Sequence, residues 1–372
     1  MPVRLEIDRG KIARATAARP DRKETGALPH IAPGLFDIQV NGCGGLDFTS
    51  ASVTPEHVAQ IARVMDPFGV ARFCPTVTSE RFEVLCNAMR AIATACDTCP
   101  EVARRIAGIH LEGPYISAED GPRGAHPPAF CRPPDWDEFQ RLQEAAGGRI
   151  RILTMAVEFD NAPDFIGQAI AGGTLVAIGH TAADGRQIRA AVDAGARLST
   201  HLGNGAHSPI RRHPNYIWDQ LAEDRLAASL IVDGHHLPAE VVKTFVRAKT
   251  PGRCILISDL AAPAGLPPGR FQGALCETEI LPDGRLIIAG QEDFLAGAAL
   301  PIGTGVANVM RFAGLGLREA IDMAAGNPAR LLGIDPGGLE PGDPADLVLL
   351  QVEPRFEIVA TLIGGEIVFG TV

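Results

Sequence analysis

The sequence predicts an α/β protein built as a (β/α)8 barrel, with a small β-sandwich domain formed by both chain termini. Two observations support this fold class. Eight short, near-continuous apolar runs follow one another along the chain, and helical patterns separate most of them. Such runs are typical of parallel strands that are buried on both faces. Eight of them alternating with helices favour a closed barrel over an open doubly wound sheet.

The expected strands are the apolar runs at residues 34–41, 71–78, 106–113, 150–158, 174–181, 196–202, 226–234 and 254–260. The expected helices repeat apolar residues with a period near 3.6 and lie at 55–65, 81–95, 137–147, 162–173, 184–196 and 238–249.

The two ends of the chain have a different character from the middle. Residues 1–28 read as two strands around an Asp8-Arg9-Gly10 turn, and residues 345–372 read as strands with a turn at Gly364-Gly365. We therefore expect 1–30 and 336–372 to form the small β-domain and 31–335 to form the catalytic barrel.

Composition narrows the function classes. The formal net charge of −10 argues against nucleic acid as a partner, because phosphate backbones need a basic surface. No apolar stretch reaches the length of about 18 residues that a membrane helix needs, so we expect no membrane partner. The eight cysteines are scattered and the N-terminus does not resemble a secretory signal, which favours the cytoplasm.

Four polar residues lie at or just beyond the ends of expected strands: Glu112, His180, His201 and Asp259. Barrel enzymes build their active sites where these strand ends converge. A single Glu or His near a strand end, such as Glu112, His180 or His201, is more often structural. Asp259 has an alternative as a helix-capping or turn residue, but its position at the end of the eighth strand favours a role as a base. Together, two carboxylates and two imidazoles on one face predict a hydrolytic metal site.

Seven stretches, spread over almost the whole chain, carry a resemblance to a known family. They are PGLFDIQVNGCGG (33–45), GIHLEGPYIS (108–117), AIGHTAAD (177–184), STHLGNGA (199–206), VDGHHLP (232–238), ISDLAAPAG (257–265) and NPARLLGI with GGLEPGDPADLVLL (327–350). In this order they resemble the N-acetylglucosamine-6-phosphate deacetylases of the amidohydrolase superfamily, which implies hydrolysis of the acetamide of a phosphorylated amino sugar.

The resemblance implies a role for each matching residue. Glu112, His180 and His201 correspond to the ligands of one divalent metal, and Asp259 to the general base and acid. His126 corresponds to the histidine that contacts the acetyl carbonyl. The substrate-contacting positions are Asn204, Gly205 (alanine in the family), Arg212 and His236. The last two correspond to phosphate contacts, and His236 is expected to reach across from the neighbouring subunit of a homodimer.

Many superfamily members carry His-x-His after the first strand, whereas this chain has Gln39-Val40-Asn41. Neutral amides are poor zinc ligands, so we expect one metal per chain and place Gln39 and Asn41 against the substrate. Zn²⁺ is the expected ion, although Fe²⁺, Mn²⁺ and Co²⁺ share this ligand set.

Some questions stay open at the level of sequence. Tyr216 and Trp218 replace a glycine-rich stretch of the family, and either line the sugar pocket or pack in the core or a dimer interface. The substrate is alternatively N-acetylgalactosamine 6-phosphate, another acylated amino sugar or a cyclic amide. The remaining hypothesis is a non-catalytic scaffold, which the retained metal ligands disfavour.

Overall fold

The structure, a computed structural model, describes residues 2–18, 28–272 and 277–371. Its largest sheet has eight parallel strands, paired in chain order with β4 and β13 at the two ends. They are β4 (Leu35–Val40), β7 (Val70–Thr78), β8 (Ile109–Glu112), β9 (Ile150–Met155), β10 (Leu175–Ile178), β11 (Leu198–Ser199), β12 (Ala227–Ile231) and β13 (Cys254–Ile257). The amide of Asp259 donates to the carbonyl of Gln39 (3.1 Å), and that of Asn41 to Leu260 (2.8 Å), which joins the ends. The predicted barrel is confirmed.

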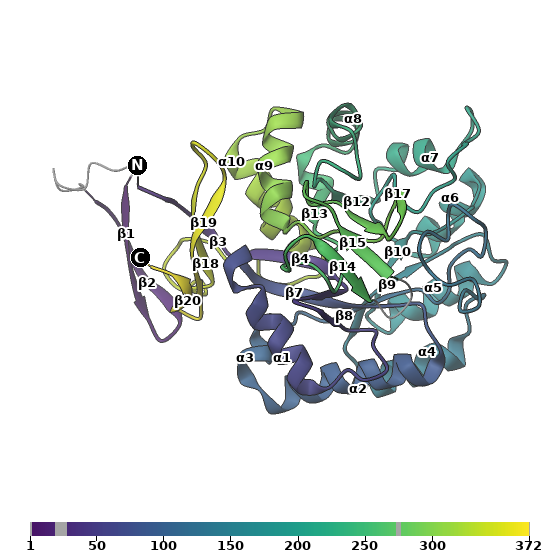
Figure 1. The fold of residues 1–372 in the computed structure, drawn as a ribbon, viewed down its shortest axis with the longest axis horizontal. Helices are drawn as coiled ribbons and strands as arrows, with labels where there is room; N and C mark the ends of the chain where they lie inside the picture. The colour runs from purple at the N-terminus through teal and green to yellow at the C-terminus, as the bar shows by residue number, and fades with distance from the viewer. Residues whose placement is uncertain (1, 19–27, 273–276, 372) are drawn as a thin grey trace.

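Helices surround the barrel (Figure 1). They are α1 (Pro55–Val64), α2 (Phe82–Thr98), α3 (Pro100–Arg105), α4 (Trp136–Ala145), α5 (Ala162–Ala171), α6 (Gly185–Ala194), α7 (Tyr216–Ala222), α8 (Ala239–Lys249), α9 (Ile302–Ala313), α10 (Leu317–Ile321) and α11 (Asn327–Leu331). Local sequence explains helix α6, where Asp184 and Gln187 form a capping box. Ile188, Ala191 and Val192 form its buried face, at the spacing that one side of a helix requires.

Both chain termini build a separate β region beside the barrel (Figure 1). Strands β1 (Val3–Asp8) and β2 (Lys11–Ala17) form the expected hairpin, and a second sheet has the order β20-β19-β18-β3. Its strands are β3 (His30–Pro33), β18 (Leu347–Gln351), β19 (Glu357–Ile363) and β20 (Glu366–Gly370). Ile12 packs into the same small core as Leu347 and Leu362. The division at residues 30 and 336 stays a prediction, and β3 pairs with β18 across it.

One sheet was not predicted. Between β13 and α9 the chain forms an antiparallel sheet of β14 (Gly269–Gln272), β15 (Glu277–Ile280), β16 (Leu286–Ile288) and β17 (Gln291–Leu295). These strands are only three to five residues long. On β15 the buried Thr278 and Ile280 alternate with more exposed residues, a pattern too short to stand out in the sequence. A further short pair, β5 (Gly42–Cys43) and β6 (Leu46–Asp47), follows β4.

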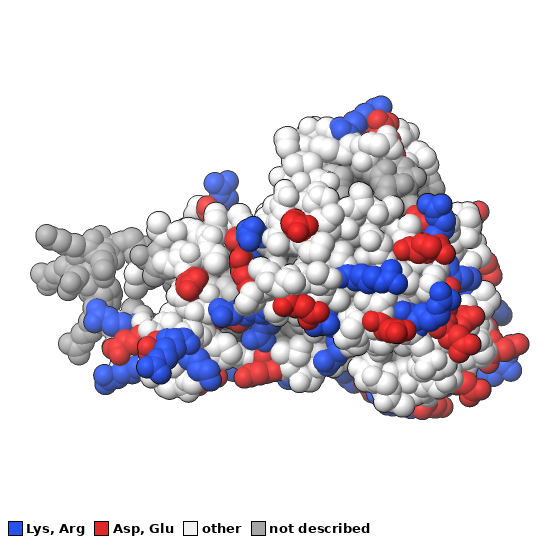
Figure 2. Space-filling model, turned by 90° about the horizontal axis from the view of Figure 1, so that it is seen from below, with Lys and Arg blue, Asp and Glu red and all other residues white. Residues whose placement is uncertain are grey.

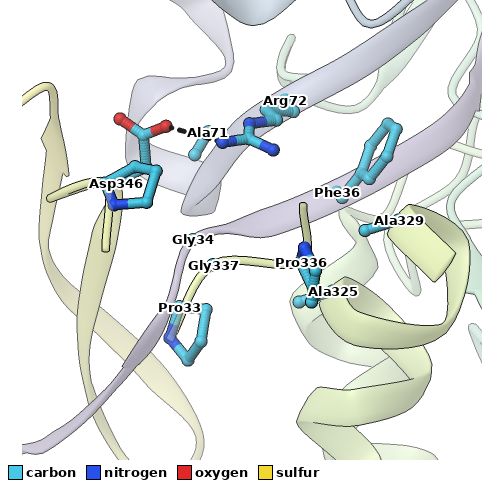
Figure 3. Close-up of a pocket in the computed structure, with 11 residues that line it drawn as sticks. Pro33, Gly34, Phe36, Ala71, Arg72, Ala325, Ala329, Pro336, Gly337 and Asp346 are labelled. Carbon is cyan, nitrogen blue, oxygen red and sulfur yellow. Dashed lines mark hydrogen bonds and ion pairs between the residues drawn. The ribbon is translucent and has the colours of Figure 1, made fainter. Parts of the chain in front are cut away.

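The junction between the barrel and the small sheet lies at the N-terminal ends of β4 and β7. Figure 3 shows a pocket there, with Gly34, Phe36 and Ala71 on one side and Pro336 and Gly337 on the other. Its free volume of about 20 Å³ is room for about one water. Arg72 forms an ion pair with Asp346 at its edge (3.3 Å). This pocket is at the opposite end of the barrel from the predicted site.

Acidic and basic side chains are interspersed over the face seen in Figure 2. In the described part of the chain, no helix is both long and apolar enough to cross a membrane.

Candidate active site

Three of the four predicted residues meet at the C-terminal end of the barrel. Glu112 ends β8, His180 follows β10, and His201 follows β11. Oε1 of Glu112 lies 3.2 Å from Nε2 of His180 and 3.0 Å from Nε2 of His201, and the two Nε2 atoms are 3.0 Å apart. All three side chains are buried. The strand-end pattern therefore predicted correctly that these residues come together.

The donor set fits a divalent cation. Nδ1 of His180 lies 2.8 Å from the carbonyl of Pro122, which can only accept, so Nδ1 carries the proton. The lone pair of a neutral His180 ring then points from Nε2 toward Glu112 and His201. Convergence of a carboxylate oxygen and two imidazole Nε2 atoms in a buried space is the ligand arrangement of a catalytic zinc site with an open position.

Glu112 and the neighbouring histidines change each other's pKa. Burial by itself would raise the pKa of Glu112, but the Nε2 atoms of His180 and His201 beside its Oε1 hold that pKa well below its usual range. Burial by itself would lower the pKa of His201, but the hydrogen bond and charge of Glu112 raise it above its ordinary value. A negative charge is thus stabilised at the centre of the site, where a cation would be favoured further.

The backbone at the site is unusual. His180, His201 and Asp259 all have positive φ angles, of 51°, 30° and 57°, a region that non-glycine residues rarely adopt. Such strained conformations persist only where the surroundings hold them, and they cluster at functional sites. Each residue lies two positions beyond the last residue of a barrel strand, so the left-handed turn sets the direction in which its side chain leaves the strand end.

Asp259 lies beside the two amide side chains of the Gln-x-Asn motif. Its Oδ1 accepts from Nε2 of Gln39 (3.2 Å) and from Nδ2 of Asn41 (2.7 Å), and the same Nε2 donates to Oε1 of Glu112 (3.0 Å). Burial, and next the charge of Glu112, raise the pKa of Asp259 to about 6. Gln39 therefore links the predicted base to the ligand group.

His126 faces the same space. Its ring meets that of His180 edge to face at 4.5 Å, and its ligand atom lies within 4.8 Å of those of Glu112 and His180. Nδ1 of His126 is 2.9 Å from the hydroxyl of Ser79, a buried residue that follows β7. Burial lowers the pKa of His126 to about 3, so the ring is neutral at physiological pH.

Gly205 lies against the ring of His180. A Cβ atom at residue 205 would come within 2.8 Å of Nδ1 of His180, and residue 205 has a φ of 54°. Asn204 is held over His201, because its Nδ2 donates to the His201 carbonyl (3.2 Å). Both residues therefore lie at the site, as expected from the resemblance.

The two expected phosphate contacts lie in different settings. His236 is mostly buried, its Nδ1 is 2.7 Å from Oδ2 of Asp233, and its charge lowers the pKa of Asp259 in the same chain. Within the single chain His236 therefore lies close enough to Asp259 for its charge to act there. Arg212 is exposed in the loop before α7.

Tyr216 and Trp218 lie on helix α7. Tyr216 is buried, and its hydroxyl accepts from the amide of His207 (2.8 Å), so it holds the loop that follows His201. Trp218 is 49% exposed on the outside of the barrel. Tyr216 therefore packs in the protein interior, the alternative that the sequence left open.

A polar layer beneath the site was missed by the sequence analysis. It includes His110, Thr154 and Thr200, all buried, and Asp37 on β4. Burial lowers the pKa of His110 to about 4 and raises that of Asp37 to about 7. His110 precedes Glu112 by two positions, which is the one signal in the sequence that places it on the same strand face.

Comparison with known proteins agrees with this geometry. Residues 31–368 match the model of the amidohydrolase family. N-acetylglucosamine-6-phosphate deacetylase of Bos taurus is 34% identical over 91% of this chain and 83% of its own length. N-acetylgalactosamine-6-phosphate deacetylase of Shewanella is 31% identical over 96% and 87%. The structure of an N-acetyl-D-glucosamine-6-phosphate deacetylase mutant from Mycobacterium smegmatis, in complex with N-acetyl-D-glucosamine-6-phosphate, superposes with a TM-score of 0.87 at 30% identity over 98% and 94%.

Proposed function

Because this chain belongs to the amidohydrolase family, we propose that it hydrolyses N-acetylglucosamine 6-phosphate to glucosamine 6-phosphate and acetate. The observation that carries the proposal is the convergence of Glu112, His180 and His201 beside Asp259. Relatives that act on phosphorylated N-acetyl amino sugars match the chain over most of its length. We further propose that the enzyme works in the cytoplasm.

Glu112, His180 and His201 would hold one divalent metal per chain, for which Zn²⁺ is the expected ion. When bound, such an ion polarises the amide carbonyl and lowers the pKa of water to about 7. Gln39 and Asn41 donate to Asp259, so they occupy the place of a second metal site with neutral hydrogen-bond donors.

Asp259 takes the proton from the attacking water and delivers it to the departing amine nitrogen. The two amides hold its Oδ1, which leaves Oδ2 to move the proton. A raised pKa suits both halves of this role, because the group must accept a proton and release it again. The neutral ring of His126 donates from Nε2 to the carbonyl oxygen as negative charge develops there.

Arg212 and His236 are proposed to bind the phosphate, the first through a charge-assisted contact. Arg212 is exposed in the single chain, where a phosphate contact or a partner subunit can reach it. We propose that the protein acts as a homodimer.

Acetate release tests the proposal directly. Protein of measured metal content is given N-acetylglucosamine 6-phosphate, its galactose epimer, or unphosphorylated N-acetylglucosamine. We expect the first to be turned over well and the last poorly. Faster turnover of the galactose epimer would instead identify the protein as an N-acetylgalactosamine-6-phosphate deacetylase, the activity for which the 31% identical Shewanella relative is named. Release from none of the three, with one metal per chain, would contradict the proposed substrate.

A further inference from the structure

A chain of three side chains crosses the barrel interior directly beneath the proposed metal ligands. Nε2 of His110 lies 2.7 Å from Oγ1 of Thr154, and Oγ1 of Thr154 lies 2.7 Å from Oγ1 of Thr200. Nδ1 of His110 lies 3.0 Å from the carbonyl of Ile38, next to Gln39. The exposed fraction of each of the three side chains is 3% or less, so water does not compete for these contacts.

The chemistry of the partners fixes the direction of every hydrogen bond. The carbonyl of Ile38 can only accept, so Nδ1 of His110 donates and Nε2 of the neutral ring accepts. Thr154 must therefore donate its hydroxyl proton to His110. Its oxygen then accepts from Thr200. Each group has one defined orientation, and none of the three can rotate without losing a buried hydrogen bond.

These three hydrogen-bonded side chains contact the backbone next to all three proposed metal ligands. His110 shares strand β8 with Glu112, and the carbonyl of Thr154 accepts from the amide of Gly113 (3.0 Å). Thr200 directly precedes His201. A Cβ atom at Gly179, which precedes His180, would lie 2.7 Å from Cγ2 of Thr154 and 2.9 Å from Cβ of Thr200. The side chains of Thr154 and Thr200 therefore pack directly against the backbone at Gly179, which precedes His180.

We propose that His110, Thr154 and Thr200 are positioning residues, which hold Glu112, His180 and His201 at the spacing that one divalent ion requires. The positive φ angles of His180 and His201 need such support, because relaxation of either turn would swing its ring away from Glu112. The inference rests on the proposed metal site and concerns residues that do not touch the ion or the substrate.

The test is the affinity of the purified full chain for Zn²⁺, measured by competition with a chelator. Thr154→Val keeps the shape of the side chain and removes the hydroxyl in the middle of the chain. We expect it to weaken Zn²⁺ binding at least about 10-fold, as disruption of outer-shell contacts does at other metal sites. Thr154→Ser keeps the hydroxyl, and we expect its affinity to stay within about 3-fold of the wild-type value.

The matched control is Thr174→Val. Thr174 is equally buried, and its hydroxyl also takes part in two contacts, to the carbonyl of Ile150 and the amide of Gln143. It precedes β10 at the far end of the barrel. We expect Thr174→Val and Thr154→Val to lower the unfolding temperature of the metal-free protein by similar amounts, and only Thr154→Val to weaken Zn²⁺ binding.

Three outcomes would overturn the inference. Equal Zn²⁺ affinity in Thr154→Val and Thr174→Val would show that the hydrogen bonds of His110, Thr154 and Thr200 stabilise the fold but do not position the metal ligands. Weak binding by Thr154→Ser would assign the effect to the methyl group that packs on Gly179. A wild-type protein that binds no divalent ion would overturn the proposed function as well, whereas the first two outcomes leave that function standing.

Discussion

The hydroxyl of Ser79 lies 2.9 Å from Nδ1 of His126. His126 is the residue proposed to stabilise the carbonyl oxygen, and it can donate from Nε2 only if Nδ1 carries no proton. In that tautomer the Ser79 hydroxyl donates to Nδ1, a role that a hydroxyl can fill. Gly113 makes the contact feasible, because a Cβ atom there would come within 2.2 Å of the Ser79 oxygen.

Ser79→Ala should lower kcat about 10-fold and change KM little, because the hydrogen bond to the carbonyl oxygen strengthens as charge develops. Steady-state acetate release measures both constants. Ser199→Ala is the matched control, since the Ser199 hydroxyl is buried and has no hydrogen-bond partner in the described structure. A kcat loss of the same size in both variants would contradict the tautomer argument.

Asp259→Asn should lower kcat by about 10²–10⁴-fold, the usual contribution of a general base, and leave the metal content unchanged. Asparagine keeps an oxygen that accepts from Asn41, so the loss reports on proton transfer rather than on position. Metal analysis and turnover are measured on the same sample. Substantial remaining turnover would remove Asp259 from the mechanism.

Arg212→Ala should raise KM for N-acetylglucosamine 6-phosphate at least about 10-fold and leave KM for the unphosphorylated sugar nearly unchanged, because a lost contact to a charged group costs about 1.5–3 kcal/mol. Arg211→Ala is the control, as both arginines are exposed in the same loop. Equal changes for both sugars would argue against a phosphate contact at Arg212.

The sequence was sufficient for the barrel because burial on both faces of parallel strands leaves a pattern that is visible locally. Ile109 and Leu111 flank His110 on β8, and all are buried. The sequence was also sufficient to predict that Glu112, His180 and His201 lie together, because the ends of the barrel strands share one face whatever their separation along the chain.

Other parts depend on three-dimensional contacts that leave no local pattern. Thr154 and Thr200 are 46 positions apart, and an isolated threonine in a strand or just after one is common in any sheet. Ser79 lies at the end of β7 and satisfies the same strand-end rule that singled out Glu112, so that rule could have included it. The sheet at 269–295 was missed because its strands are only three to five residues long.

Asp37 predicts a pH dependence of stability. Burial raises its pKa to about 7, above the value in an unfolded chain, so the folded protein binds more protons than the unfolded protein between about pH 4 and pH 7. The stabilisation is complete below about pH 4 and is lost as the pH rises through 7. This rise of the Asp37 pKa above its ordinary value corresponds to about 4 kcal/mol.

Asp37→Asn should remove this part of the pH dependence, because the amide keeps an acceptor for the backbone amides of Gln39 and Ser258 and does not ionise. Denaturant unfolding at pH 5 and pH 8 measures the free energies. The difference between the free energies of unfolding at pH 5 and pH 8 should shrink in Asp37→Asn. It should stay unchanged in Asp160→Asn, an exposed control. An unchanged difference in both would show that Asp37 does not titrate in this range.

Gly205→Ala should weaken metal binding, because the new Cβ would lie 2.8 Å from Nδ1 of His180 and displace a ring that Pro122 and Glu112 hold on both sides. Residue 205 also has a positive φ, which by itself disfavours alanine. Gly148→Ala separates the two effects, since Gly148 has a φ of 76° and no atom within 4 Å of its added Cβ. We expect both variants to lose about 1 kcal/mol of stability from backbone strain, and only Gly205→Ala to lose Zn²⁺ affinity, about 10-fold. Unchanged affinity in Gly205→Ala would mean that the His180 ring adapts to a methyl group.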